Sequence, residues 1–260
     1  MRRVPRLAAN LSTLFTEAPF LERFAAAARA GFRWVEYQFP YDFDKDEVAA
    51  RARAAGLQVV LHNMPPGGRA GDRGIACHPG REAEFRDSVE RAIDYARAAG
   101  CPRLHCLAGV APPGIEPGHL HATYVANLRN AAARLVVEGM TLLIEPINTR
   151  AVPGYFLTGS RQAERILDEL GAPNVRLQYD LFHMQIMEGD LAKTIERLLP
   201  KISHIQLADV PGRHEPGTGE INFPWLLEHI DRLGYAGWIG CEYNPLGDTV
   251  EGLKWAKPYL

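Results

Sequence analysis

The stretch Val137-Glu-Gly-Met-Thr-Leu-Leu-Ile-Glu145 decides the fold of this chain. A long helical segment at residues 117–138 ends there at Gly139, and a short apolar run then leads to Glu145. Glycine is a natural end for a helix because it accepts the left-handed backbone that follows the last turn. The order helix, glycine, short strand is typical of βαβ units, in which parallel strands alternate with helices.

The same order repeats along the whole chain. We expect strands at residues 6–10, 34–38, 57–62, 103–107, 141–145, 175–180, 202–206 and 238–242. We expect helices at residues 19–30, 44–55, 81–99, 117–138, 160–170, 190–199, 224–233 and 249–257. Eight such units predict an α/β fold, a single (β/α)8 TIM barrel over residues 1–260, rather than an open doubly wound sheet. No Gly-x-Gly-x-x-Gly follows the first strand, so nothing supports a dinucleotide site.

Composition excludes several classes of partner. The 260 residues are 47% hydrophobic and 23% charged, with 29 Lys and Arg against 31 Asp and Glu. Because no long basic run is present, we expect no nucleic-acid partner. No apolar stretch approaches the roughly 20 residues that span a bilayer, so we expect no membrane insertion and a cytoplasmic location. The cysteines form no Cys-x-x-Cys pair and are expected as reduced core thiols: Cys77, Cys101, Cys106 and Cys241.

Four oxygen-donating side chains stand near the ends of four consecutive strands. They are Glu145, Asp180, Gln206 and Glu242. In a barrel, the ends of parallel strands face one side, where active sites are built. Three carboxylates that converge beside a carboxamide would repel one another without a cation, so the pattern predicts a bound divalent metal. An all-oxygen set favours Mg²⁺ or Mn²⁺ over tetrahedral zinc.

Two connections are unusually long and rich in Gly and Pro. They cover residues 63–80 and 209–222, and both follow strand ends, so both should lie over the side that bears the oxygen donors. Such composition suits irregular or hinged lids. His183 lies three residues beyond Asp180, close enough to reach the same pocket, where it could orient a substrate oxygen.

Several short motifs are distributed along the whole chain. They are Ala8-Ala-Asn-Leu-Ser12, Leu14-Phe-Thr16, Val35-Glu-Tyr37, Phe39-Pro-Tyr41, Gly74-Ile-Ala76, Pro79-Gly-Arg81, Leu143-Ile-Glu-Pro-Ile-Asn-Thr149, His183-Met-Gln-Ile-Met-Glu-Gly-Asp190 and Ala208-Asp-Val-Pro-Gly-Arg-His-Glu-Pro-Gly-Thr-Gly-Glu-Ile221. Together they resemble the hydroxypyruvate isomerase family of xylose-isomerase-like barrels. By this resemblance Glu145, Asp180, Gln206 and Glu242 match the metal ligands. Gln206 stands where related sugar epimerases usually have a histidine.

The resemblance implies a reaction: interconversion of hydroxypyruvate and 2-hydroxy-3-oxopropanoate (tartronate semialdehyde) through an enediolate. Glu145 and Glu242 match the pair that transfers the proton. The metal would chelate the substrate oxygens and stabilise the enediolate charge. Because such a substrate is a small 2-oxo or 2-hydroxy acid, Arg73 and Arg213 are candidates to hold its carboxylate, beside His183.

Other functions remain open at this point. The same site could serve a 2-dehydrotetronate (2-oxo-tetronate) isomerase or a ketose 3-epimerase, and pocket length would decide between them. The aromatic candidates for closing the pocket are Phe39, Tyr41, Phe156, Trp225 and Tyr243. A metal-dependent hydrolase would favour several histidines and a basic groove, and a non-catalytic binding barrel would not need the oxygen donors. Association into a homo-oligomer is an expectation by analogy with other barrels.

Overall fold

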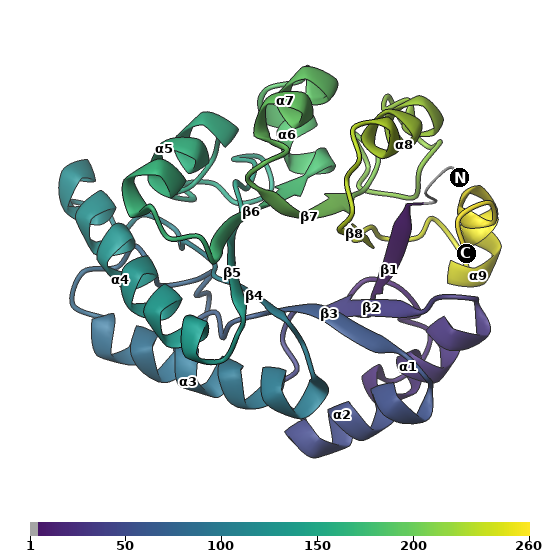
Figure 1. The fold of residues 1–260 in the computed structure, drawn as a ribbon, viewed down its shortest axis with the longest axis horizontal. Helices are drawn as coiled ribbons and strands as arrows, with labels where there is room; N and C mark the ends of the chain where they lie inside the picture. Colours follow the sequence, from purple (N-terminus) through teal and green to yellow (C-terminus); the bar gives the residue numbers. More distant parts are fainter. Residues whose placement is uncertain (1–4) are drawn as a thin grey trace.

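The computed structural model describes residues 5–260 and confirms the (β/α)8 barrel; the expected span from residue 1 includes residues 1–4, which lie outside this range. Eight parallel strands close in sequence order, and β8 pairs back with β1. They are β1 (Arg6–Asn10), β2 (Trp34–Tyr37), β3 (Gln58–Asn63), β4 (Arg103–His105), β5 (Thr141–Ile144), β6 (Val175–Asp180), β7 (Ile202–Leu207) and β8 (Trp238–Cys241). Figure 1 shows these strands at the centre of a ring of helices.

The helices follow the strands in the expected order. They are α1 (Phe20–Arg29), α2 (Lys45–Ala54), α3 (Glu82–Ala99), α4 (Pro117–Val137), α5 (Ser160–Leu170), α6 (Leu181–Met187), α7 (Leu191–Leu198), α8 (Phe223–Arg232) and α9 (Thr249–Gly252), which continues as the 3-10 helix η1 (Leu253–Ala256). Gly100 and Gly171 end α3 and α5 with φ of 64° and 59°, the left-handed conformation expected of a terminal glycine. The sequence pattern did not predict α6, a short helix that starts directly after β6.

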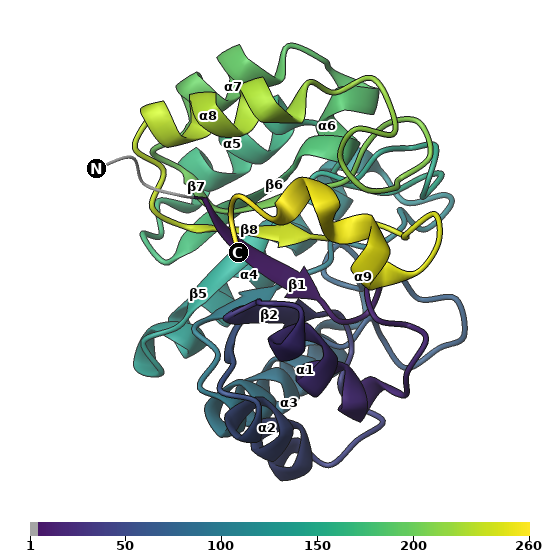
Figure 2. The ribbon, with the colours of Figure 1, turned by 90° about the vertical axis from the view of Figure 1, so that its right-hand side faces the viewer.

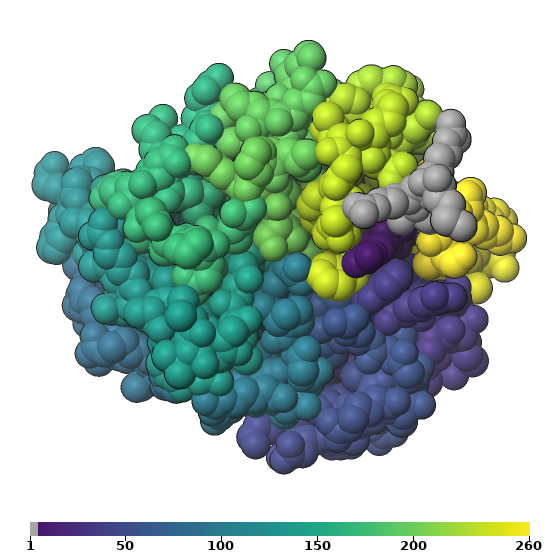
Figure 3. Space-filling model, viewed as in Figure 1, coloured from purple at the N-terminus to yellow at the C-terminus, as the bar shows by residue number. Residues whose placement is uncertain are grey.

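The barrel interior is apolar in one part and polar in another. A small buried cluster of Ala8, Val60, Leu61 and Leu143 packs against Trp34 and Trp238. Figure 3, which takes the same view as Figure 1, shows no open channel at the centre of the ring that residues 5–260 form. The larger core cluster includes side chains from both the strands and the surrounding helices. The apolar packing supports the polar groups that stand at the carboxyl ends of the strands.

Both long connections have their backbones tied down. In residues 208–222 the buried carboxylate of Asp209 accepts hydrogen bonds at 2.9 to 3.1 Å from five backbone N–H groups, those of Val210, Gly217, Thr218, Gly219 and Ile221. In residues 64–81, Gly74 pairs with Ala108 beyond β4. In Figure 2 the β1 arrow points to the right, which is the side of the barrel where the loops that follow the strands lie.

Two expectations about composition can be compared with the structure. All four cysteines are buried and free, which confirms that they are core thiols. Among residues 5–260, none of the helices has the length and apolar character that a transmembrane span requires.

Candidate active site

The four oxygen donors occupy corresponding places at one end of the barrel. Glu145 directly follows β5, and Glu242 directly follows β8. Asp180 is the last residue of β6, and Gln206 is the second-to-last residue of β7. All four side chains are buried; Glu145 is 5% and Glu242 7% exposed, at the edge of a cavity. The strand pattern therefore brought these residues to one end of the barrel, as the sequence indicated.

Glu145, Asp180 and His183 form a compact buried group. One ligand atom from each lies within 4.8 Å of the others, a spacing that could hold a metal ion. The Nε2 atom of His183 is 3.6 Å from Oδ2 of Asp180 and 3.9 Å from Oε1 of Glu145. The other oxygen of Asp180 caps α6 by accepting from the backbone N–H of Phe182 at 2.7 Å. Oδ2 of Asp180 is buried without a hydrogen-bond partner in residues 5–260, so it is free to bind a cation.

The hydrogen bonds around His183 fix which of its nitrogens bears the proton. The backbone N–H of Ala151 donates to Oδ1 of Asn148 at 2.6 Å, which turns the Asn148 amide NH₂ toward Nδ1 of His183, also at 2.6 Å. Nδ1 therefore accepts, and Nε2 bears the proton. Burial lowers the pKa of His183 to about 4, so the ring is neutral at pH 7. A neutral ring with Nε2–H directed into the cluster is suited to donate to a substrate oxygen.

Glu242 lies among hydrogen-bond donors. It accepts from Asn10 Nδ2 at 2.9 Å, Gln38 Nε2 at 3.2 Å, Gln206 Nε2 at 2.7 Å and Arg213 Nη2 at 2.6 Å. Burial raises the pKa of Glu242 to about 7, and the charge of Arg213 opposes the rise. The same guanidinium is 3.9 Å from Asp180, so Arg213 lies between two carboxylates of the site.

Glu145 has different neighbours. Burial raises its pKa well above the usual range, and the nearby charges of Asp180 and Glu242 raise it further. His105 Nε2 lies 3.4 Å from Oε2 of Glu145. With Oδ1 of Asn63 as the acceptor of the 3.1 Å bond from Nδ1 of His105, Nε2 presents its lone pair to Glu145. A protonated Glu145 could donate to that lone pair, whereas an ionised one would face it as a second acceptor.

A buried polar layer lies directly beneath Gln206. The amide NH₂ of Gln206 donates at 2.7 Å to both Glu36 and Glu242. The Oε1 atom of Gln206 therefore accepts from Gln178 Nε2, at 2.6 Å. Glu36 in turn bonds to His204 Nε2 at 2.6 Å. His204 is therefore a buried, hydrogen-bonded histidine, and Glu36 supports the site from below.

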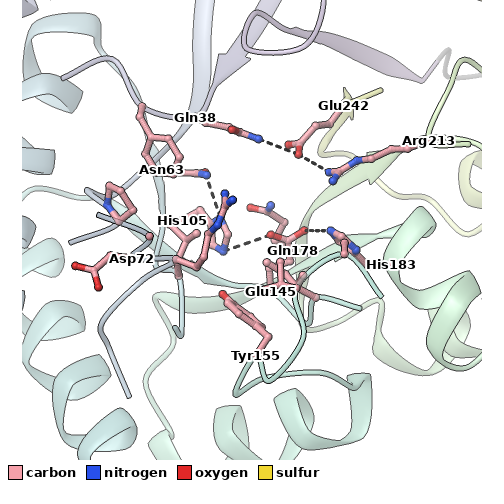
Figure 4. Close-up of a pocket in the computed structure, with 18 residues that line it drawn as sticks. Gln38, Asn63, Asp72, His105, Glu145, Tyr155, Gln178, His183, Arg213 and Glu242 are labelled. Carbon is pink, nitrogen blue, oxygen red and sulfur yellow. Dashed lines mark hydrogen bonds and ion pairs between the residues drawn. The ribbon is translucent and has the colours of Figure 1, made fainter. Parts of the chain in front are cut away.

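One cavity of ≈370 Å³ joins these groups (Figure 4). Its charged and polar lining residues are Gln38, Asn63, Asp72, Arg73, His105, Glu145, Tyr155, Gln178, His183, Arg213 and Glu242. Every residue assigned to the site from the sequence lines the cavity or, like Asp180 and Gln206, directly contacts a residue that does.

Sequence reasoning missed part of the lining and misjudged the aromatic residues. Gln178 could have been found, because it stands two residues before Asp180 and so faces the same side of β6. Of the five aromatic candidates Phe39 lines the cavity, and the other four pack elsewhere. Trp225 stacks on His229 at 5.0 Å, and Tyr243 is fully buried beside Trp255.

Comparison with known proteins assigns the chain to a family. A family model described as a xylose isomerase-like TIM barrel matches residues 24–259. The chain therefore belongs to the xylose isomerase-like TIM barrel family. A crystal structure titled AP endonuclease, family 2, from Brucella melitensis superimposes with a TM-score of 0.96 at 50% identity, covering 98% of this chain and 99% of that one.

Curated relatives narrow the class. The hydroxypyruvate isomerase of Escherichia coli (strain K12) is 51% identical over 98% of this chain and 99% of its own length. The 2-oxo-tetronate isomerase of Cupriavidus necator is 50% identical over 99% of both chains. At this similarity over the full length, the protein is an isomerase of the hydroxypyruvate isomerase type.

Proposed function

We propose that this isomerase interconverts hydroxypyruvate and 2-hydroxy-3-oxopropanoate, and that it depends on a divalent metal, with Mg²⁺ or Mn²⁺ preferred. The observation that supports this most directly is the pair of buried carboxylates, Glu145 and Glu242, which face one cavity from β5 and β8 (Figure 4). Isomerisation of hydroxypyruvate moves one proton between adjacent carbons and one between the oxygens that they bear, so it needs a base and an acid at one bound substrate.

The residues fit a hard cation. Glu145, Asp180, Gln206 and Glu242 would hold it through oxygen atoms. Within residues 5–260 Oδ2 of Asp180 has no hydrogen-bond partner, and burial, together with the nearby carboxylates, raises the pKa values of both glutamates. Gln206 Oε1 keeps a second lone pair beyond its bond to Gln178. When bound, the metal would act as a Lewis acid that acidifies the substrate C–H bond and stabilises enediolate charge.

Glu242 and Glu145 would carry out the two halves of the proton transfer, one as the base and the other as the acid. Glu242 is held by four donors that stabilise its ionised form, which suits removal of the substrate proton. Glu145 faces the lone pair of His105 and has a raised pKa, which suits delivery of a proton to the neighbouring carbon. His183 Nε2–H is placed to donate to a substrate oxygen, and Arg73 and Arg213 provide positive charge for the carboxylate.

The four-carbon 2-oxo-tetronate is the second candidate substrate. A cavity of ≈370 Å³ is roomier than a three-carbon acid requires, and the relative from Cupriavidus necator is named for that substrate. A metal-dependent hydrolase receives less support. The carboxylate and histidine cluster of residues 5–260 contains a single histidine, and the chain has a net charge of −2.

The proposal is tested by purified protein in deuterated water with Mg²⁺ or Mn²⁺. We expect isomerisation of hydroxypyruvate with deuterium incorporation at the reacting carbon, and loss of both activities after chelation and dialysis. Parallel measurement of kcat/KM for 2-oxo-tetronate ranks the two substrates. Turnover without exchange, or full turnover after metal removal, would reject the mechanism.

A further inference from the structure

The two arginines that line the cavity have different surroundings. Arg213 donates to Glu242 at 2.6 Å and lies 3.9 Å from Asp180, so carboxylates of the site already match its charge. Arg73 lines the same cavity from the loop between β3 and α3 and is exposed. Within residues 5–260 it forms no ion pair, although Asp72 is its neighbour in sequence. Arg73 is therefore a cation of the cavity whose charge is unmatched.

Asp72 cannot neutralise Arg73 because it is already engaged by Arg81. The guanidinium of Arg81 donates twice to Asp72, at 2.9 and 2.7 Å, and twice to Glu84, at 2.8 and 2.7 Å. The side chains of Arg81 and Asp72 are only 8% and 10% exposed. The two carboxylates also accept from the backbone N–H groups of Arg69 at 2.9 Å and Gly68 at 2.8 Å. Asp72, Arg81 and Glu84, called the loop clamp below, thus fix the backbone before Arg73.

The backbone after Arg73 is fixed as well. Gly74 donates its N–H to the carbonyl of Pro66 at 2.8 Å and pairs with Ala108 in an antiparallel bridge. A Cβ at Gly74 would collide with the backbone and side chain of Leu107, and φ is 101°, so this close approach requires glycine. Arg73 is therefore held between two fixed points, with its own side chain left to the cavity.

We propose that the loop clamp presents Arg73 to the substrate carboxylate, and that Arg73 makes the site select acids over neutral sugars. The inference rests on the proposed function in that the substrate is a small acid. A guanidinium matches a carboxylate through two parallel hydrogen bonds, which an uncharged hydroxymethyl group cannot replace. A loop that is already ordered loses less conformational entropy when the ligand binds. Asp72 and Arg81 are positioning residues, because they act through Arg73.

The first test compares an acid with its neutral counterpart in Arg73→Gln. Dihydroxyacetone bears a hydroxymethyl group where hydroxypyruvate bears its carboxylate. We expect KM for hydroxypyruvate to rise about 10- to 100-fold, with a smaller change in kcat, while the inhibition constant of dihydroxyacetone stays within about twofold. Arg69→Gln is the matched control, since it removes the same charge from the same loop and its side chain does not line the cavity. We expect this control to match the wild type.

The second test asks whether the clamp acts through Arg73. Asp72→Asn keeps the size of the side chain but weakens its pairing with Arg81, so KM for hydroxypyruvate should rise, though less than in Arg73→Gln. In the double variant that combines Asp72→Asn with Arg73→Gln, KM for hydroxypyruvate should be no higher than in Arg73→Gln alone. Once Arg73 is replaced, the loop clamp has no guanidinium left to position. If Asp72→Asn does not fold, Arg81→Lys removes the two-pronged contact, keeps the charge and carries the same expectations.

Three results would overturn the proposal. One is an unchanged KM for hydroxypyruvate in Arg73→Gln, and another is an equal rise for the acid and the neutral ligand. The third is a full additive loss in the double variant, which would mean that the clamp only stabilises the fold. Failure of the proposed function has a different signature, namely a wild-type protein that isomerises no acid. In that case calorimetric binding of hydroxypyruvate to wild type and Arg73→Gln still tests the role of Arg73.

Discussion

Glu145 and Glu242 lie at corresponding places in the barrel, directly after β5 and β8, yet their surroundings are opposite in kind. Glu242 accepts from a guanidinium and three amides, which all stabilise its charge. Glu145 lies beside Asp180 and faces an imidazole lone pair from His105. Equivalent positions on the fold therefore place similar side chains, while the neighbours decide what each can do. Environments that separate two carboxylates in this way indicate an acid and a base.

The largest expected effect separates the two roles. Glu242→Gln and Glu145→Gln both keep an oxygen that can bind metal, so each removes mainly the proton-transfer function. We expect each to lower isomerisation by about 10² to 10⁴ fold. Glu145→Gln should still exchange the hydroxypyruvate C–H proton with deuterated water, because Glu242 remains as the base. Glu242→Gln should lose exchange as well, as measured by NMR.

If exchange survives in Glu242→Gln and is lost in Glu145→Gln, then Glu145 is the base and Glu242 the acid. Full isomerisation by both variants would remove the pair from the reaction altogether. Thermal unfolding of each variant provides the control for folding. We expect Glu242→Gln to lose some stability, because an amide NH₂ cannot accept from the donors that surround Glu242, so activity is compared on protein shown to be folded.

A second prediction concerns pH and metal binding. The pKa of Glu242 is raised from its usual range to about 7, so below pH 7 the metal-free protein holds a proton there, and Glu145 is raised in the same direction. A metal must displace those protons, so its affinity should fall as pH drops from 8 to 6, by up to about tenfold per unit for each proton displaced. Calorimetric titration with Mn²⁺ in buffers of different ionisation enthalpy measures the protons released.

An affinity that stays constant between pH 6 and 8 would show that both carboxylates are already ionised in the metal-free protein. The contrast in protonation drawn between Glu145 and Glu242 would then be lost.

The smallest expected effect comes from removing one donor on the Glu242 side. Asn10 Nδ2 donates to Glu242 at 2.9 Å and to Glu36 at 3.0 Å, so Asn10→Ala leaves two buried carboxylates one donor short. We expect a loss of about 1–3 kcal/mol in the free energy of unfolding. The pKa of Glu242 should rise, which moves the ascending limb of the pH–rate profile to higher pH.

Asn174→Ala is a suitable control for that variant. Asn174 donates to the carbonyl of Ala132, ahead of β6 and away from the cavity. It should lose stability without moving the pH profile. A shift of equal size in both variants would contradict the local cause assigned to Asn10.

Much of the fold could be predicted because its signals are local. Each strand is a short apolar run, and glycines such as Gly100 and Gly171 mark helix ends through their backbone conformation. The helix α6 is not predictable from the sequence because seven residues are too few to show a helical period, and its cap, Asp180, is also the last residue of a strand. One carboxylate oxygen of Asp180 caps α6, and the other faces Glu145 and His183.

The site was predictable in its members but not in its connections. The rule that strand ends meet was enough to gather Glu145 and Glu242. It could not show that the amide of Gln206 bonds to Glu36, because β2 and β7 are far apart in sequence and meet only across the barrel interior. The loop clamp was hidden for a similar reason, since the pairing of Asp72 with Arg81 depends on how an irregular loop folds back on itself.

The central claim is that Glu145, Asp180, Gln206 and Glu242 hold one divalent cation between the acid and the base. Crystals grown with Mn²⁺ and measured for anomalous scattering test this most directly. We predict a single strong peak within coordination distance of an oxygen from each of the four side chains, with Arg213 moved away from Asp180. No peak in the cavity, or a peak bound only by Glu145, Asp180 and His183, would contradict the claim.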